Sequence, residues 1–206
     1  MKTVQDISQE TFRDRGSKFI GYLFPVSSVE QFESELRKIK SKYADATHHC
    51  YAWRMNPNSV TEFSQDDGEP AGTAGLPILN KLKSFDLING GCVVVRYFGG
   101  TKLGKSGLIH AYGYTAELCL SKASLLTIVP TKNFRITYPY NQQSQIDKLK
   151  YRFDLKELDA QYLENVTLDM ACRTEEANKF TTHLEKLEHK GIEIEKIGSG
   201  FLTMRT

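Results

Sequence analysis

The sequence lacks a long apolar run, a cysteine pair and a strong excess of either charge. No stretch approaches the roughly 18 apolar residues that a membrane-spanning helix requires, and the first residues lack the apolar core of a signal peptide. We therefore expect a cytoplasmic protein without a membrane span. The net charge is +2 over 206 residues, so any basic surface for nucleic acid must come from local clustering of lysine and arginine.

Cysteine is scarce, and its spacing argues against two kinds of site. The four cysteines are far apart and form no CxxC pair: they are Cys50, Cys92, Cys119 and Cys172. This spacing suits neither a zinc site nor a disulfide framework. We expect buried, reduced thiols, and the sequence predicts no metal ion and no cofactor.

Glycine is distributed unevenly along the chain. Ten of the 15 glycines lie between Gly68 and Gly113, and only three follow residue 130. Glycine lets the backbone approach a ligand closely or adopt a positive φ. We therefore expect a functional site in the middle third of the chain and a glycine-poor scaffold in the last third.

The pattern of apolar residues predicts an α+β protein with two domains, residues 1–130 and 131–206, that meet near Pro130. The signals in the first domain come in this order: strands at 3–7 and 18–25, a helix at 29–43, a strand at 48–55, a helix at 76–85, a strand at 92–97 and a helix after residue 104. The second domain gives the order strand, helix, strand, strand, helix, strand, which is the ferredoxin-like arrangement.

The segment GGTKLGKS, residues 99–106, satisfies the phosphate-loop pattern G-x-x-x-x-G-K-[ST]. Gly99 and Gly104 would frame the loop, while Lys105 would reach phosphates and Ser106 would hold magnesium. Such a nucleotide hydrolase also needs a parallel sheet and an acidic residue at a second strand end, whereas the N-terminal strands suggest antiparallel pairing. A weaker interpretation, an anion-binding turn of backbone amides at a helix N-terminus, does not need that architecture.

The segment QDDGEPAGTAGLP, residues 65–77, places three carboxylates beside three glycines. Asp66, Asp67 and Glu69 could together bind a hard cation. The alternative, which we favour, is a turn in which the aspartates bond their own backbone and Gly68 takes a positive φ. The segment from Thr73 to Leu76 leads into the next helix, whose first amides are free to bind an anion or a carboxylate.

Two predicted strands carry polar residues. Alternate side chains of a strand share a face, so His48 and Cys50 point to one side and His49 to the other. We interpret this strand as half-buried, with His49 as a candidate surface residue. Arg96 follows three valines and needs a partner, because an isolated buried charge is costly. We expect one of the carboxylates of residues 66–69 to pair with it, either as a structural clamp or beside a phosphate contact.

Three motifs resemble the YigZ/IMPACT family in their order and spacing. They are HHCYAW, DDGEPAGTAGLPIL and VVVRYFGGTKLGKSGLIHAYG, and they cover residues 48–114. The length and the C-terminal element order are also similar to bacterial members, so the resemblance spans the whole chain. The family's motif positions fall on His48, His49, Asp66, Asp67, Gly68, Glu69, Pro70, Gly72, Thr73, Arg96, Gly99, Gly100, Leu103, Gly104 and Gly107.

This resemblance implies both a fold and a role. The fold is an N-terminal α/β domain of the ribosomal-protein type seen in domain IV of elongation factor G, followed by a ferredoxin-like domain similar to domain V of that factor. The role is regulation of translation, because the eukaryotic relatives modulate the protein kinase that reports amino-acid starvation. RNA, the ribosome or translation factors are the partners that the resemblance implies.

Two positions depart from the family pattern. Gln65 stands where relatives often have a small polar residue, and Lys105 and Ser106 replace what is usually a small residue and a glycine. The residues that complete the phosphate-loop pattern are thus ones that the family does not require. This departure weakens the nucleotide-hydrolase hypothesis.

The leading hypothesis is a non-catalytic protein that binds RNA or the ribosome through its glycine loops. Arg96, Lys102 and Lys105 would contact phosphates, and Tyr97 or His49 would stack on a base. The other binding residues predicted at these loops are Thr73, Gly99, Gly100, Gly104 and Ser106. Two alternatives remain: a nucleotide- or metal-dependent hydrolase that uses the 99–106 loop or the carboxylates, and a protein-binding module that uses the open sheet of the second domain.

Overall fold

The computed structural model describes residues 1–205, apart from the side chain of Glu188, as an α+β protein with two five-stranded sheets and five α-helices. Residue contacts divide the chain into a first unit, residues 1–127 with Arg205, and a second unit, residues 128–204. Among the described residues, no helix is long and apolar enough to cross a membrane.

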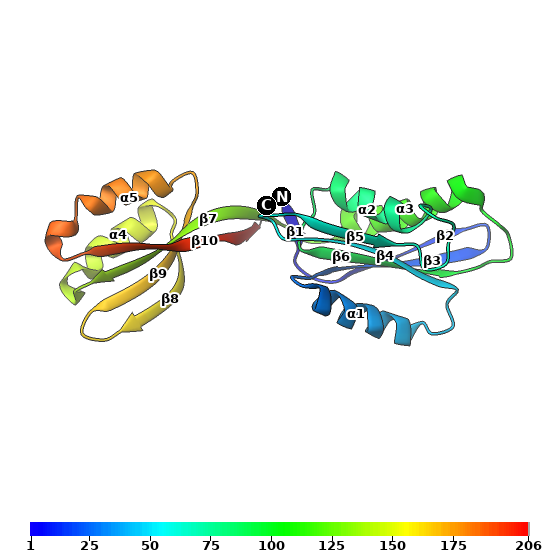
Figure 1. Cartoon of the computed structure of the whole chain (residues 1–206), viewed down its shortest axis with the longest axis horizontal. Coiled ribbons are helices and arrows are strands. Elements are labelled where there is room, and N and C mark those ends of the chain that lie inside the picture. The colour runs from blue at the N-terminus through cyan, green and yellow to red at the C-terminus, as the bar shows by residue number, and fades with distance from the viewer. Residues whose placement is uncertain (206) are drawn as a thin grey trace. The chain divides into compact units, whose positions relative to one another are not determined.

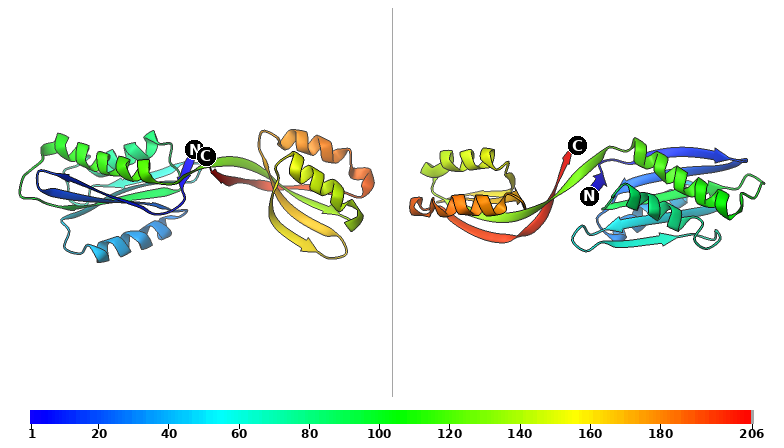
Figure 2. Two further views of the ribbon diagram at one scale, coloured as in Figure 1. Left: turned by 180° about the vertical axis from the view of Figure 1, so that it is seen from behind. Right: turned by 90° about the horizontal axis from the view of Figure 1, so that it is seen from above.

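The first unit is built on a sheet in which every neighbouring pair of strands is antiparallel, in the order β2-β3-β6-β4-β5. Helix α1 covers one face of this sheet, and α2 and α3 lie side by side on the other (Figures 1 and 2). The elements are β1 (Lys2–Val4), β2 (Ser8–Asp14), β3 (Ser17–Pro25), α1 (Val29–Lys42), β4 (His48–Met55), β5 (Thr61–Gln65), α2 (Gly75–Ser84), β6 (Gly90–Tyr97) and α3 (Gly104–Lys122).

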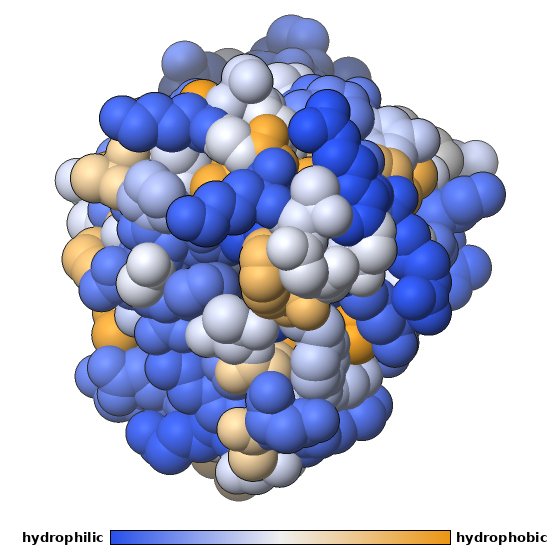
Figure 3. Space-filling model, turned by 90° about the vertical axis from the view of Figure 1, so that its right-hand side faces the viewer, coloured by the Kyte–Doolittle hydropathy of each residue, from blue (hydrophilic) through white to orange (hydrophobic). Residues whose placement is uncertain are grey.

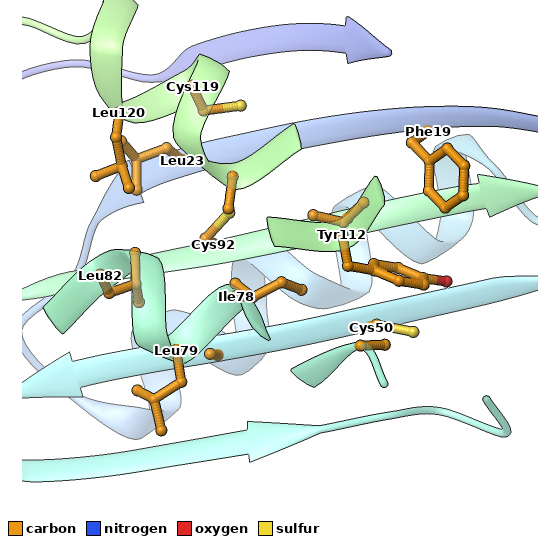
Figure 4. Close-up of a cluster of buried hydrophobic side chains, with 14 of the residues drawn as sticks. Phe19, Leu23, Cys50, Ile78, Leu79, Leu82, Cys92, Tyr112, Cys119 and Leu120 are labelled. Carbon is orange, nitrogen blue, oxygen red and sulfur yellow. The ribbon is translucent and has the colours of Figure 1, made fainter. Parts of the chain in front are cut away.

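The central strands of this sheet are apolar on both faces because helices cover both faces. Val95 packs in the core beneath α1 with Phe32, whereas its neighbour Val94 packs in the core beneath α2 and α3 with Ile78. Figure 4 shows this second core, in which Tyr112 of α3 extends over the sheet. The consecutive valines of β6 therefore serve two cores, as the alternation of side chains along a strand requires.

The second unit has the predicted order of strand, helix, strand, strand, helix, strand. Its strands lie in the order β10-β7-β9-β8, and α4 and α5 contribute to one apolar core on the sheet. The elements are β7 (Leu125–Tyr138), η1 (Tyr140–Gln142), α4 (Gln143–Arg152), β8 (Lys156–Tyr162), β9 (Val166–Arg173), α5 (Ala177–Glu185), η2 (Glu188–Lys190) and β10 (Glu193–Arg205). The first residues of β7 also pair with β1, so β7 contributes residues to both units.

The sequence pattern missed two strands, β2 and β5, which are the edges of the first sheet. Their sequences, SQETFRD and TEFSQ, contain one large apolar residue each. The strand predicted at 3–7 is shorter, at Lys2–Val4. The expected thiols are confirmed, because all four cysteines are buried and free.

Gly99 makes a close backbone contact with the turn between β2 and β3. A Cβ atom at Gly99 would lie 1.9 Å from the carbonyl carbon of Gly16 and 2.2 Å from the amide nitrogen of Ser17. Gly99→Ala must therefore displace the turn, and we expect it to lower the free energy of unfolding by about 1–3 kcal/mol. Urea denaturation measures the change.

The matched control is Gly113→Ala in α3. A Cβ there meets nothing closer than 3.7 Å, and alanine is the better helix former by about 0.5–1 kcal/mol. This variant should be as stable as the parent protein or more stable. A Gly99→Ala variant with unchanged stability would contradict the close contact.

Candidate anion-binding site

A hollow of about 370 Å³ lies at the N-terminal end of α3. Its walls come from the loop after β5, the end of β6 and the first turn of α3. The charged residues among them are Glu69, Arg96, Lys102 and Lys105. The hollow thus brings together the two glycine-rich loops that the sequence analysis singled out.

The first turn of α3 is open to an anion. Its N-cap residue is Leu103, which offers no side-chain hydrogen bond, and the first turn contains no acidic residue. Gly104 has a φ of +72°, a conformation that suits glycine. The first amides of a helix lack partners within the helix and carry partial positive charge. The exposed side chains of Lys102 and Lys105 add to that charge.

Arg96 forms a buried ion pair with Glu69 through Nη1 and Oε1. Arg96 is 5% exposed and Glu69 is 8% exposed. The Tyr112 hydroxyl donates to the same Oε1 at 2.9 Å, and Nη2 of Arg96 donates to Ser17 Oγ at 3.4 Å. The pair therefore joins β6, the loop after β5 and α3. It confirms the expectation that a carboxylate of residues 66–69 is the partner of Arg96.

The guanidinium of Arg96 is also held by two aromatic rings. Its central carbon lies 5.5 Å from the ring centroids of Phe19 and Phe98. Within the described residues, Arg96 Nε is the one buried side-chain nitrogen or oxygen without a hydrogen-bond partner. A buried donor without a partner is costly, and a water molecule or a bound anion that accepts from it would remove that cost.

Asp66 is a structural cap. Its carboxylate accepts hydrogen bonds from the backbone N–H groups of Gly72 at 2.8 Å, Ala74 at 3.0 Å and Gly75 at 2.8 Å. Gly68 takes a φ of +88°. The favoured interpretation of this segment as a local turn is confirmed, and the carboxylate expected at the start of α2 comes from the chain itself.

The three carboxylates have separate partners and are not gathered around one point. Asp67 accepts a hydrogen bond from the His49 amide at 2.7 Å and lies 3.6 Å from Lys40 Nζ, while Glu69 pairs with Arg96. No group of three His, Cys, Asp or Glu in the described residues could hold a metal ion. The geometry therefore gives no support to a cation site at Asp66, Asp67 and Glu69.

The two rings predicted to stack on a base lie outside the hollow. His49 is 7% exposed, which contradicts its predicted surface position, and its Nε2 donates to the Tyr43 carbonyl at 3.1 Å. Tyr97 is half-buried and donates to Asp45 at 2.7 Å. The aromatic residue at the hollow is Phe98, which is 47% exposed. Strand alternation could have placed Phe98 on the face opposite Tyr97, but the sequence analysis did not use it.

The remaining predicted residues shape the loops. Thr73 is buried and donates to the Pro70 carbonyl at 2.6 Å. The Gly99 amide donates to Ser17 Oγ at 3.2 Å. Gly100 has a φ of +87°, and Ser106 is exposed in the first turn of α3.

The segment that matches the phosphate-loop pattern does not lie in the parallel sheet in which such loops occur. Strand β6, which precedes the loop, lies between β3 and β4 and is antiparallel to both. A hydrolase loop of this type follows a strand of a parallel sheet. The geometry therefore weighs against the nucleotide-hydrolase alternative and retains an anion-binding helix N-terminus.

Comparison with known proteins gives consistent matches. Residues 15–120 match the Impact N-terminal domain. IMPACT family member YvyE of Bacillus subtilis (strain 168) is 34% identical over 190 residues, which cover 90% of this chain and 85% of that protein. IMPACT family member YigZ of Escherichia coli (strain K12) is 31% identical over 180 residues, which cover 86% and 88%. These matches confirm the resemblance seen in the motifs.

A solved structure supports the same fold. A crystal structure of a hypothetical protein is 28% identical to this chain and aligns with a TM-score of 0.64, covering 95% of this chain and 96% of the other. The hollow and the pair between Arg96 and Glu69 lie within the range that matches the Impact N-terminal domain.

Removing one partner of the buried ion pair should destabilise the protein more than removing both partners. Glu69→Leu leaves Arg96 charged, buried and unpaired, so we expect the free energy of unfolding to fall by about 3–5 kcal/mol. Adding Arg96→Met should recover part of this loss, because no lone charge remains. Glu176→Ala, which breaks an exposed pair with Lys179, should cost less than about 1 kcal/mol. A double variant less stable than Glu69→Leu alone would contradict this account.

Burial lowers the pKa of His49 below its usual value of 6.5, against the opposing effect of Asp67. The unfolded chain therefore binds a proton at this site before the folded chain does. The free energy of unfolding should fall as the pH decreases from about 7 to about 5. His49→Gln should reduce this dependence in urea titrations at several pH values, and equal slopes for both proteins would show that His49 does not contribute.

Proposed function

The chain belongs to the IMPACT family, and we propose that it is a translation-associated regulatory protein that binds RNA phosphate, without catalysis, in the hollow at the start of α3. The observation that carries this proposal is the uncapped first turn of α3 between two exposed lysines, beside a buried arginine with a free donor. The family resemblance supports RNA, the ribosome or translation factors as partners.

The charge balance of the hollow favours an anion. Lys102, Lys105 and Arg96 face one carboxylate, that of Glu69, whose charge Arg96 compensates. Backbone amides, lysine and arginine are the groups that contact nucleic-acid phosphates in proteins. The end of the first unit where β6 leads into α3 faces the viewer in Figure 3, and it is mainly hydrophilic with small apolar patches. A charged, hydrated ligand suits such a surface better than an apolar partner.

Two buried ionisable groups near Glu69, the Cys50 thiol and the Tyr112 hydroxyl, are poorly suited to catalysis. Burial is the main cause that raises the pKa of the Cys50 thiol and of the Tyr112 hydroxyl. Cys50 Sγ also donates to the Asp66 carbonyl at 2.9 Å. A thiol must lose its proton to act as a nucleophile, so Cys50 is poorly suited to that role.

The resemblance to the family also supports a location, domain boundaries and a fold type for the first domain. We place the protein in the cytoplasm and its two domains at residues 1–130 and 131–206. We assign the first domain to the ribosomal-protein type seen in domain IV of elongation factor G. The antiparallel α+β architecture of the first unit is compatible with this assignment.

The test is RNA affinity as a function of salt. Lys102→Ala with Lys105→Ala should weaken binding of a fluorescent oligouridylate and flatten the log–log salt slope by about 1.4, since each phosphate contact on a single strand contributes about 0.7. Lys122→Ala, at the other end of α3, is the control and should change neither quantity. Unchanged affinity and slope in the double variant would reject the proposal.

A further inference from the structure

The two oxygens of the Glu69 carboxylate have different surroundings. Oε1 receives the Arg96 guanidinium and the Tyr112 hydroxyl, and it lies 3.9 Å from Nε2 of His48. Oε2 receives no hydrogen bond from any residue that the structure describes, and it keeps some accessible surface, because it is not among the fully buried atoms that lack a partner. Glu69 is more than nine-tenths buried and lines the hollow. The hollow therefore contains a strong hydrogen-bond acceptor that a ligand can reach and that has no partner within the described residues.

Such an acceptor favours a ligand that carries a hydrogen-bond donor. A carboxylate has lone pairs for about four hydrogen bonds, and only Oε1 of Glu69 accepts any from the protein, so Oε2 can accept one from a ligand that displaces water. Arg96 balances the charge of Glu69, so the carboxylate can accept a hydrogen bond without repelling a nearby phosphate strongly. The same hollow offers phosphate-binding groups at the start of α3 and on Lys102 and Lys105. A fitting ligand thus combines a hydroxyl donor with a phosphate.

We infer that Glu69 accepts a hydrogen bond from a ribose 2′-hydroxyl and that the hollow selects RNA over DNA. This inference rests on the proposed binding of RNA phosphate. Within a nucleic-acid chain, the sugar of RNA carries a hydroxyl donor close to the phosphate, and the sugar of DNA does not. Dinucleotide-binding folds use an acidic side chain in the same chemical role, as the acceptor for a ribose hydroxyl. The volume of about 370 Å³ is within the range of small-ligand pockets.

The decisive experiment compares three oligomers on the full-length protein. Octamers of uridine, deoxyuridine and 2′-O-methyluridine differ only at the 2′ position, and the methylated sugar keeps an oxygen acceptor but lacks the donor. Fluorescence anisotropy at one fixed salt concentration should show the uridine octamer binding roughly tenfold more tightly than either of the others. Uridine monophosphate should also compete better than deoxyuridine monophosphate, which would extend the preference to a free nucleotide.

A variant assigns the preference to one side chain. Glu69→Gln keeps the shape but replaces the charged acceptor with a neutral amide, so the preference for uridine should fall below about threefold. Glu117→Gln is the matched control, because Glu117 is a half-exposed carboxylate of α3 that pairs with Lys81 outside the hollow. It should leave the preference intact. Circular dichroism establishes that each variant folds, and the three oligomers test the unmodified protein even where Glu69→Gln does not fold.

The outcomes separate the inference from the proposed function. Equal affinity for the three octamers, with binding still dependent on Lys102 and Lys105, would overturn the role of Glu69 and leave phosphate binding in place. A full preference for uridine in folded Glu69→Gln would also overturn that role. Binding that does not depend on the two lysines would reject the proposed function itself.

Discussion

The buried ion pair between Arg96 and Glu69 is the interaction on which the candidate site depends. It joins the C-terminal end of β6 to the loop after β5, and the Tyr112 hydroxyl connects the pair to α3. A buried ion pair is not in itself a large source of stability, because removing two charges from water is costly. Its effect is to fix the positions of the two segments, since moving either partner away would leave the other as an unpaired buried charge. The walls of the hollow are thereby held at a defined distance.

The starts of the three helices of the first unit show how the site differs from the rest of the fold. Ser28 caps α1 by accepting a hydrogen bond from the Gln31 amide at 3.2 Å. Asp66 caps α2 by accepting hydrogen bonds from the backbone amides of Ala74 and Gly75. Helix α3 begins at Gly104, and the side chain of its N-cap residue, Leu103, makes no capping hydrogen bond. The chain thus provides its own acceptors for two helices and leaves the third open toward an external anion.

Several features could be predicted from the sequence because they depend on local patterns. Helix spacing, the consecutive valines of β6 and the element order of the second unit were of this kind. So was the turn at Asp66, in which short polar side chains bond nearby backbone. The pairing of Arg96 followed from the cost of burying a lone charge, although three carboxylates were equal candidates. Only the three-dimensional path of the loop after β5 selects Glu69.

Other features depend on contacts that a sequence pattern does not contain. The edge strands β2 and β5 are too polar to show a strand signal, and their pairing with β3 and β4 defines them. His49 was expected at the surface, but α1 covers that face of the sheet and buries it. The places of Phe98 and of Glu69 Oε2 at the hollow depend on the meeting of the two glycine-rich loops in space, which no sequence pattern contains.

The most direct test of the central claim is an amide-resolved NMR titration of the ¹⁵N-labelled protein with an oligouridylate. The account predicts that the backbone amides of Gly104, Lys105 and Ser106 and the side-chain Nε–H of Arg96 shift together, with one common dissociation constant. Shifts that occur only in residues 128–204, with these four signals unchanged at saturation, would contradict it.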